Sequence, residues 1–174
     1  GVPFAKGEVT AKSLHNYGIC NIPVDSWINA RWQDGSVKWA GFSALIPKGV
    51  NVTTLRAGYG KHVKHKLVNI SRKGIVVNTG DMEVLFPRHG NSFMDYIRYK
   101  GIKVADMGRV VASTSLSSYK SVIDTSYIEN NGDIRAVIRV NGHMVGDKES
   151  NMTLPFTLRF YLYYVSEQIR IQHS

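Results

Sequence analysis

The chain has 174 residues, and its 22 Lys and Arg against 13 Asp and Glu give a formal net charge of +9. With 43% hydrophobic residues and a single cysteine, the composition excludes a disordered tail and an intrachain disulfide framework. No apolar run reaches the roughly 20 residues of a membrane-spanning helix, so we expect no membrane partner. The positive charge favours polyanions, but no nucleic-acid-binding motif accompanies it, so nucleic acid is the least favoured partner.

The first predicted element in chain order is a hairpin within residues 30–39, whose sequence is A-R-W-Q-D-G-S-V-K-W. Asp34 and Gly35 predict a tight turn between two strands. Trp32 and Trp39 flank the turn, where they can share one face of the hairpin or cross its end. One interpretation is a hairpin that is stabilised by its aromatic side chains. The other is a carbohydrate-binding platform with a basic partner for a carboxylate, and its candidate residues are Arg31, Trp32, Lys38 and Trp39.

A domain boundary is predicted where the strand-like pattern is interrupted. The segment 57–60, A-G-Y-G, breaks the pattern, a basic cluster follows it at 61–66, and new strand-like sequence begins at Leu67. We therefore expect two domains, a small one at residues 1–60 and a larger one at residues 65–174.

Strand-like segments follow one another through the second predicted domain. The short ones are rich in Val, Ile or other apolar residues and lie at residues 74–77, 82–86 and 102–104. The segment 94–100 suits either a strand or a turn or two of helix. This pattern predicts an all-β protein.

Two longer segments alternate between apolar and polar side chains with the two-residue period of a half-buried strand. In residues 134–140 the apolar side chains at positions 134, 136, 138 and 140 face one way, and Arg135 and Arg139 face the other. Residues 157–165 repeat the pattern, and the side chains opposite the apolar ones there are Arg159, Tyr161 and Tyr163.

Turn signals bracket the first of these two segments. The sequence N-N-G-D at residues 130–133 predicts a turn before it. After it, Asn141 and Gly142 form the dipeptide that is most typical of a two-residue hairpin turn, so we expect the strand to end there.

The usual catalytic signatures are missing from the sequence, which has no phosphate-binding glycine-rich loop and no Gly-x-Ser-x-Gly motif. Cys20 lies in the apolar-flanked segment G-I-C-N-I-P, so we expect a buried, inert thiol rather than a nucleophile. His62 and His65 have a spacing that could hold a metal on a helix, but neighbouring lysines oppose a cation. We therefore predict no cofactor, no metal and no catalytic residue in this chain.

Three sequons for asparagine glycosylation are present, each with Ser or Thr at the third position and no proline between. They begin at Asn51, Asn69 and Asn151. These sites matter only if the protein is exported from the cell.

Two segments of the first predicted domain resemble the opening domain of the exo-rhamnogalacturonan lyase family and its bacterial relatives. They are G-V-P-F-A-K-G-E at residues 1–8 and the hairpin sequence at residues 30–39. Ala5 and Gln33 stand where the family pattern has prolines, which leaves the turn residues intact. In that family the opening domain is a small β-barrel of the RIFT type.

The second predicted domain is similar to the central β-sandwich of the same family. The similar segments are residues 132–140, residues 154–161 and the sequence I-R-I-Q-H at residues 169–173. The resemblance therefore covers essentially the whole chain. It implies a small RIFT-type β-barrel followed by an antiparallel β-sandwich that is incomplete in this chain.

Members of this family are longer, and a large C-terminal α/α-toroid carries much of their active-site cleft. The resemblance therefore implies the non-catalytic N-terminal β-region of a secreted polysaccharide lyase that acts on acidic, rhamnogalacturonan- or pectin-like chains. Its partners would be this polysaccharide and the C-terminal domains of the same protein. Because the chain begins at Gly1 and shows no signal peptide, we expect a processed or trimmed chain.

Two other functions remain open. Strand-like sequence at both ends of the chain leaves open sheet edges, which predicts a homo-oligomer or polymer. Such a protein would be a structural subunit of an extracellular fibre or assembly, built on a lyase-like scaffold and carrying sugar on its sequons. The second function is a carbohydrate-binding module, which would use Trp27, Trp32 or Trp39 and requires at least one exposed indole.

Overall fold

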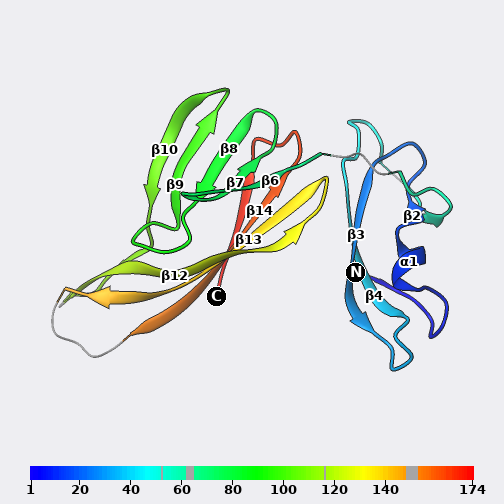
Figure 1. The fold of residues 1–174 in the computed structure, drawn as a ribbon, viewed down its shortest axis with the longest axis horizontal. Helices are drawn as coiled ribbons and strands as arrows, with labels where there is room; N and C mark the ends of the chain where they lie inside the picture. Colours follow the sequence, from blue (N-terminus) through cyan, green and yellow to red (C-terminus); the bar gives the residue numbers. More distant parts are fainter. Residues whose placement is uncertain (52, 62–64, 116, 148–152) are drawn as a thin grey trace. The chain divides into compact units, whose positions relative to one another are not determined.

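The computed structural model describes residues 1–51, 53–61, 65–115, 117–147 and 153–174. Within these residues the chain forms strands and one short helix (Figure 1), which confirms the predicted all-β class. No helix among them is long and apolar enough to cross a membrane. The contacts divide the chain into two units, Gly1–His65 with Gly132–Ile134 and Lys66–Asn131 with Arg135–Ser174.

The first unit contains a three-stranded antiparallel sheet in the order β1-β4-β3 and a two-stranded sheet of β2 and β5. Its elements are β1 (Val2–Pro3), α1 (Ala11–Leu14), β2 (Tyr17–Gly18), β3 (Val24–Arg31), β4 (Val37–Ala44) and β5 (Arg56–Ala57). The predicted turn at Asp34 and Gly35 is confirmed, because it joins β3 to β4. A small core gathers Phe4, Val9, Leu14, Val37 and Ala40.

Helix α1 has no counterpart among the predicted elements, because four residues are too few to show a helical period. Local hydrogen bonds at its first residues stabilise this helix instead. The N–H of Ser13 donates to the hydroxyl of Thr10 at 3.0 Å, and the N–H of Thr10 donates to the hydroxyl of Ser13 at 2.9 Å. This capping box begins the helix, which places Leu14 in the core.

The second unit is an antiparallel sandwich of two five-stranded sheets, in the orders β10-β9-β8-β7-β6 and β11-β12-β13-β14-β15. The strands of the first sheet are β6 (Val68–Ser71), β7 (Gly74–Asn78), β8 (Met82–Phe86), β9 (Met94–Tyr99) and β10 (Ile102–Gly108). Those of the second sheet are β11 (Val111–Ser113), β12 (Ser118–Asn131), β13 (Arg135–Gly146), β14 (Leu154–Tyr163) and β15 (Ile169–His173). The segment that suited a strand or a helix is therefore strand β9.

The core of the second unit lies between its two sheets. Phe86 of β8 and Phe160 of β14 are almost completely buried, and their ring centroids lie 4.9 Å apart. Every second residue of β13 and β14 points into this core, which confirms the predicted alternation; examples are Ile138, Leu158 and Leu162. Each side chain of this kind contributes roughly 1.5–3 kcal/mol to the free energy of unfolding.

The predicted hairpin turn at Asn141 and Gly142 is wrong, because both residues lie in the interior of β13. A Cβ at Gly142 would lie 2.4 Å from the carbonyl oxygen of Val122 and 2.6 Å from Cζ of Phe156. The glycine is therefore required by the close approach of its neighbours rather than by a turn. The side chain of Asn141 accepts hydrogen bonds from two other side chains on the sheet.

Candidate functional site

The sequence allows two interpretations of the hairpin at residues 30–39, and in the structure polar atoms of Trp32 and Arg31 bond within the first unit. The indole N–H of Trp32 donates to the carbonyl oxygen of Phe4 at 3.1 Å, and Lys38 Nζ lies 4.6 Å from the centroid of the Trp32 ring. Nη1 of Arg31 donates to the carbonyl oxygen of Gly35 at 2.9 Å. Because these contacts occupy the indole donor and one face of the ring, they favour the interpretation of a stabilised hairpin for Trp32.

Trp39, by contrast, keeps 41% of its surface exposed. Register shifts on either side of Ala30 place bulges in the pairing of β3 with β4. Because Val37 and Ala40 are both buried, the two residues between them, Lys38 and Trp39, face away from the core. A carbohydrate-binding module requires at least one exposed indole, and Trp39 meets this requirement.

Trp27, the third tryptophan, packs across the backbone of β4. A Cβ at Gly41 would lie 2.2 Å from its ring, so the glycine makes room for the indole. The Trp27 side chain is half-buried in this position.

The turn of the hairpin is held by Asp34. Its Oδ1 accepts hydrogen bonds from the N–H of Ser36 at 3.0 Å and from the hydroxyl of Ser36 at 2.5 Å. These bonds, the one from the hydroxyl first, lower the pKa of Asp34 below its ordinary value of 3.8. The Ser36 hydroxyl also accepts the N–H of Gly7 at 3.0 Å, so the two segments that carry the family resemblance are bonded to each other.

The expectation of a buried thiol at Cys20 is wrong, because this side chain is exposed. Ile19 and Ile22 form a β-bridge, in which the N–H of Ile22 donates to the carbonyl oxygen of Ile19 at 3.0 Å. Cys20 and Asn21 consequently occupy the tip of a tight turn, and Asn21 has a left-handed φ of 59°. The apolar flanks belong to the stem of this turn and do not cover the thiol.

The glycosylation candidates Asn51 and Asn69 are both exposed, and Asn69 lies on the edge strand β6. Asn151 lies outside the described residues, as does His62, one of the two histidines with metal-like spacing. In the part of the chain that the structure describes, no group of three or more His, Cys, Asp or Glu side chains could hold a metal ion.

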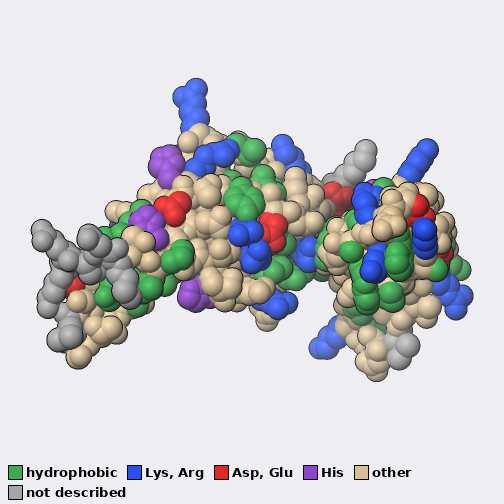
Figure 2. Space-filling model, turned by 90° about the horizontal axis from the view of Figure 1, so that it is seen from below, with side chains coloured by type: hydrophobic (Ala, Val, Ile, Leu, Met, Phe, Trp, Pro, Cys, Tyr) green, Lys and Arg blue, Asp and Glu red, His purple; other side chains and the backbone are tan. Residues whose placement is uncertain are grey.

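Basic and aromatic side chains share the outer face of the second sheet in the second unit. They come from four neighbouring strands, on which outward-facing positions alternate with core positions. We call them the arginine–tyrosine face, which consists of Tyr127, Glu129, Arg135, Arg139, Arg159, Tyr161 and Arg170. Figure 2 shows that Lys and Arg side chains are more widespread than Asp and Glu on the side of the molecule in view.

Glu129 is the acidic member of this face. Its two carboxylate oxygens accept hydrogen bonds from Nε of Arg159 at 3.0 and 2.9 Å, and one of them lies 3.9 Å from Nη1 of Arg139. Arg139 and Arg159 are direct cross-strand partners, an arrangement of like charges that is unfavourable by itself. The single carboxylate reduces this repulsion and still leaves the pair of arginines with a net positive charge.

Two guanidinium groups lie near the ring of Tyr161. Cζ of Arg135 is 6.0 Å and Cζ of Arg170 is 5.2 Å from the ring centroid. The hydroxyl of Tyr161 donates to Oε1 of Gln172 at 3.0 Å, which restrains the ring. Arg170 forms no ion pair with any residue that the structure describes.

This arrangement suits an acidic carbohydrate. A guanidinium group pairs with a carboxylate through two parallel hydrogen bonds. Each exposed ion pair is worth little by itself, so strong binding requires several of them at once.

The sequence alone placed several of these side chains correctly but did not show that they meet. The alternation in residues 134–140 and 157–165 predicts that Arg135, Arg139 and Arg159 point away from the core, as they do. The position of Glu129 depends on a register shift in the pairing of β12 with β13. A local pattern contains no signal for such a shift, so the face as a whole was not predicted.

Comparison with known protein families matches both units. The "PcRGLX-like N-terminal RIFT barrel domain" matches residues 1–58, and the "PcRGLX-like protein central beta sandwich domain" matches residues 67–174. "Uncharacterized protein YetA" of Bacillus subtilis (strain 168) is 26% identical over 191 residues, which cover 100% of this chain and 22% of that protein. The chain thus spans about a fifth of the length of this relative. It belongs to the PcRGLX-like family and carries the RIFT-barrel and central β-sandwich domains of that family.

Proposed function

We propose that these two domains form the non-catalytic N-terminal β-region of a secreted PcRGLX-like polysaccharide lyase and bind its acidic, rhamnogalacturonan- or pectin-like chain. The observation that carries the proposal is the arginine–tyrosine face, on which four arginines accompany one glutamate. The net charge of +9 supports it, because a positive field attracts a polyanion over a distance. In this proposal the lyase chemistry belongs to other parts of the protein.

Binding to the face depends on several weak contacts that act together. A polyuronide presents carboxylates at regular intervals, so neighbouring arginines pair with successive sugars and the contacts reinforce one another. Because Arg170 is exposed and the other arginines of the face are only half-buried, salt screens these charges, with a Debye length of about 10 Å at 0.1 M ionic strength. The affinity is therefore expected to fall steeply as salt is added.

Affinity electrophoresis tests the proposal with the 174-residue protein. Gels that contain polygalacturonate should retard it relative to gels that contain a neutral galactan, and added salt should remove the retardation. Arg170→Gln should weaken the retardation, whereas Arg72→Gln, the same charge change in an exposed turn between β6 and β7, should not. Equal losses in the two variants would show that net charge binds the polymer and that the face does not.

A separate experiment tests the proposal that these two domains are non-catalytic. The 174-residue protein should generate no ultraviolet absorbance from rhamnogalacturonan, because the unsaturated product of a lyase requires a catalytic base and a stabilised intermediate. Clear turnover by this protein alone would contradict the assignment of the chemistry to other parts of the protein.

A structural role in an extracellular assembly is a second candidate, favoured by one open side of the sandwich. The edge strand β10 exposes 71% of Ile102 and 59% of Val104, and the edge strand β15 exposes 54% of Ile171. Val104 and Ile169 also line a groove of about 380 Å³. Exposed edges of this kind pair readily with a strand of another chain.

Sedimentation velocity at several protein concentrations tests the second candidate. Regular oligomers that Val104→Lys removes would support an assembly through this edge, since a charge on an edge strand opposes pairing. A monomer at every concentration would contradict it.

A further inference from the structure

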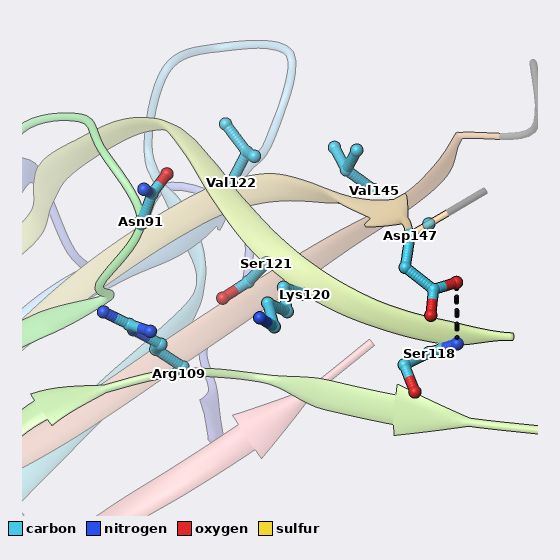
Figure 3. Close-up of a pocket in the computed structure, with 9 residues that line it drawn as sticks. Asn91, Arg109, Ser118, Lys120, Ser121, Val122, Val145 and Asp147 are labelled. Atoms are coloured by element: carbon cyan, nitrogen blue, oxygen red, sulfur yellow. Dashed lines mark hydrogen bonds between the residues drawn. The ribbon is translucent and has the colours of Figure 1, made fainter. Parts of the chain in front are cut away.

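A pocket of about 240 Å³ opens in the second unit, away from the residues of the arginine–tyrosine face. Figure 3 shows the side chains around it, which come from the loop after β8, from the segment before β11, from β12 and β13, and from Asp147 directly after β13. The lining residues that matter for its chemistry are Asn91, Arg109, Ser118, Lys120, Val122 and Val145.

Hydrogen bonds of the backbone and of the Ser121 hydroxyl hold the walls of this pocket in place. The N–H of Val110 donates to the hydroxyl of Ser121 at 3.1 Å, and the N–H of Ser121 donates to the carbonyl oxygen of Val110 at 3.0 Å. Gly90 and Ile123 exchange two backbone hydrogen bonds at 3.1 and 2.6 Å. The neighbours of Asn91 and Arg109 are therefore fixed to β12, so that the pocket is formed before any ligand arrives.

The pocket carries two cations, Arg109 and Lys120, and one carboxylate, Asp147. Neither Arg109 nor Lys120 forms an ion pair with any residue in the described part of the chain. Oδ1 of Asp147 accepts the N–H of Ser118 at 3.1 Å, which holds this carboxylate at one end of the pocket and leaves the two cations in excess. Figure 3 shows this bond at the end of the pocket opposite Arg109.

One side of the pocket is apolar. Lys120 and Val145 are cross-strand partners, and Val122 lies two residues further along β12 on the same side. A cation thus stands beside two valine side chains. This combination recognises a ligand that joins an anionic group to a small hydrocarbon part.

We propose that this pocket binds a small organic carboxylate, with the carboxylate on Arg109 and Lys120 and the hydrocarbon part against Val122 and Val145. A volume of about 240 Å³ suits a ring or short chain with one acidic group. The amide of Asn91 and the hydroxyl of Ser118 offer further hydrogen bonds to the ligand. The proposal does not rest on polysaccharide binding, since it concerns a different set of residues.

Titration of the 174-residue protein with benzoate, followed by backbone amide shifts in NMR spectra, tests this site. Saturable shifts should centre on Lys120, Ser121 and Gly146, and benzamide, which has the same shape without the charge, should not reproduce them. Arg109→Gln should weaken binding by about tenfold or more, as the loss of a charge-assisted hydrogen bond requires. Lys73→Gln, the same charge change in an exposed turn, should leave the affinity unchanged.

Three outcomes would overturn the proposal. Equal shifts with benzamide would mean that the valines alone bind the ring. Tighter binding of sulfate or phosphate at the same amides would assign the pocket to inorganic oxyanions. An absence of saturable shifts with benzoate, in a protein whose spectrum shows it to be folded, would mean that the pocket binds no small carboxylate.

Discussion

The indole N–H of Trp32 donates a hydrogen bond to the carbonyl oxygen of Phe4, 3.1 Å away. Phe4 also donates its own N–H to the carbonyl oxygen of Lys38 at 3.0 Å, and its ring packs edge-on against Tyr17 at 5.2 Å. The start of the chain is thereby bonded to the turn end of the hairpin. The two sequence segments that resemble the family are thus bonded into one structural feature. Within it, Trp32 stabilises the contact between them.

Replacing Trp32 with Phe tests this task, because it removes the donor and keeps an aromatic ring. The free energy of unfolding should fall by about 1 kcal/mol, the typical net value of one hydrogen bond. Urea denaturation followed by circular dichroism measures the change. Trp39→Phe is the matched control, since Trp39 is 41% exposed, and it should cost less than about 0.5 kcal/mol. Equal costs would mean that the bond to Phe4 does not stabilise the fold.

Gly142→Ala is expected to destabilise the sandwich strongly. The new Cβ would lie 2.4 Å from the carbonyl oxygen of Val122, an atom of the neighbouring backbone that cannot turn away. Overpacking of this kind costs about 1–3 kcal/mol, and urea denaturation measures it. Thr125→Ala, at an exposed position of β12, is the control and should change the free energy of unfolding much less. A neutral Gly142→Ala would show that β12 can move away from β13 at little cost.

The same glycine shows where sequence reasoning succeeds and where it stops. Alternation identified the buried faces of β13 and β14, because a two-residue period follows directly from the geometry of a strand. The Asn141-Gly142 pair gave a false turn, since a local signal cannot distinguish a glycine that bends the chain from one that admits a neighbouring backbone. That distinction depends on Val122, some twenty residues away, and so on tertiary structure.

The same limit applies to the candidate sites. The hairpin residues could be identified as candidates from the sequence, because two tryptophans and a turn lie within ten residues. The arginine–tyrosine face and the pocket around Arg109 and Lys120 draw on segments that are far apart in the sequence. Their residues become neighbours only through strand register, which the sequence pattern does not specify across bulges.

Acid should weaken the hairpin turn through Asp34. Hydrogen bonds from Ser36 lower the pKa of Asp34 in the folded protein below its ordinary value of 3.8. A group with a lowered folded pKa stabilises the fold fully above its unfolded pKa, and this contribution is lost as the pH falls from about 4 through the folded pKa. The melting temperature of the natural protein should therefore fall as the pH is lowered through this window.

Asp34→Asn isolates this effect, because the amide oxygen still accepts from Ser36 but does not titrate. The difference in melting temperature between the natural protein and Asp34→Asn should be largest at neutral pH and shrink below about pH 4. Asp95→Asn, which replaces another exposed carboxylate, serves as the control for general charge effects. A constant difference between the natural protein and Asp34→Asn across the acid range would contradict the assignment.

Glu129→Gln should move stability and polyanion affinity in opposite directions. The change removes the carboxylate that pairs with Arg159 and Arg139, so the two cross-strand arginines repel each other and the free energy of unfolding falls by about 1 kcal/mol. The arginines released on the face should raise the affinity for polygalacturonate at low salt, measured by affinity electrophoresis. Glu83→Gln is the control with the same charge change, since its carboxylate pairs with Arg98 on the other sheet and its loss should leave this affinity nearly unchanged. Equal gains from the two variants would assign polyanion binding to net charge instead of the arginine–tyrosine face.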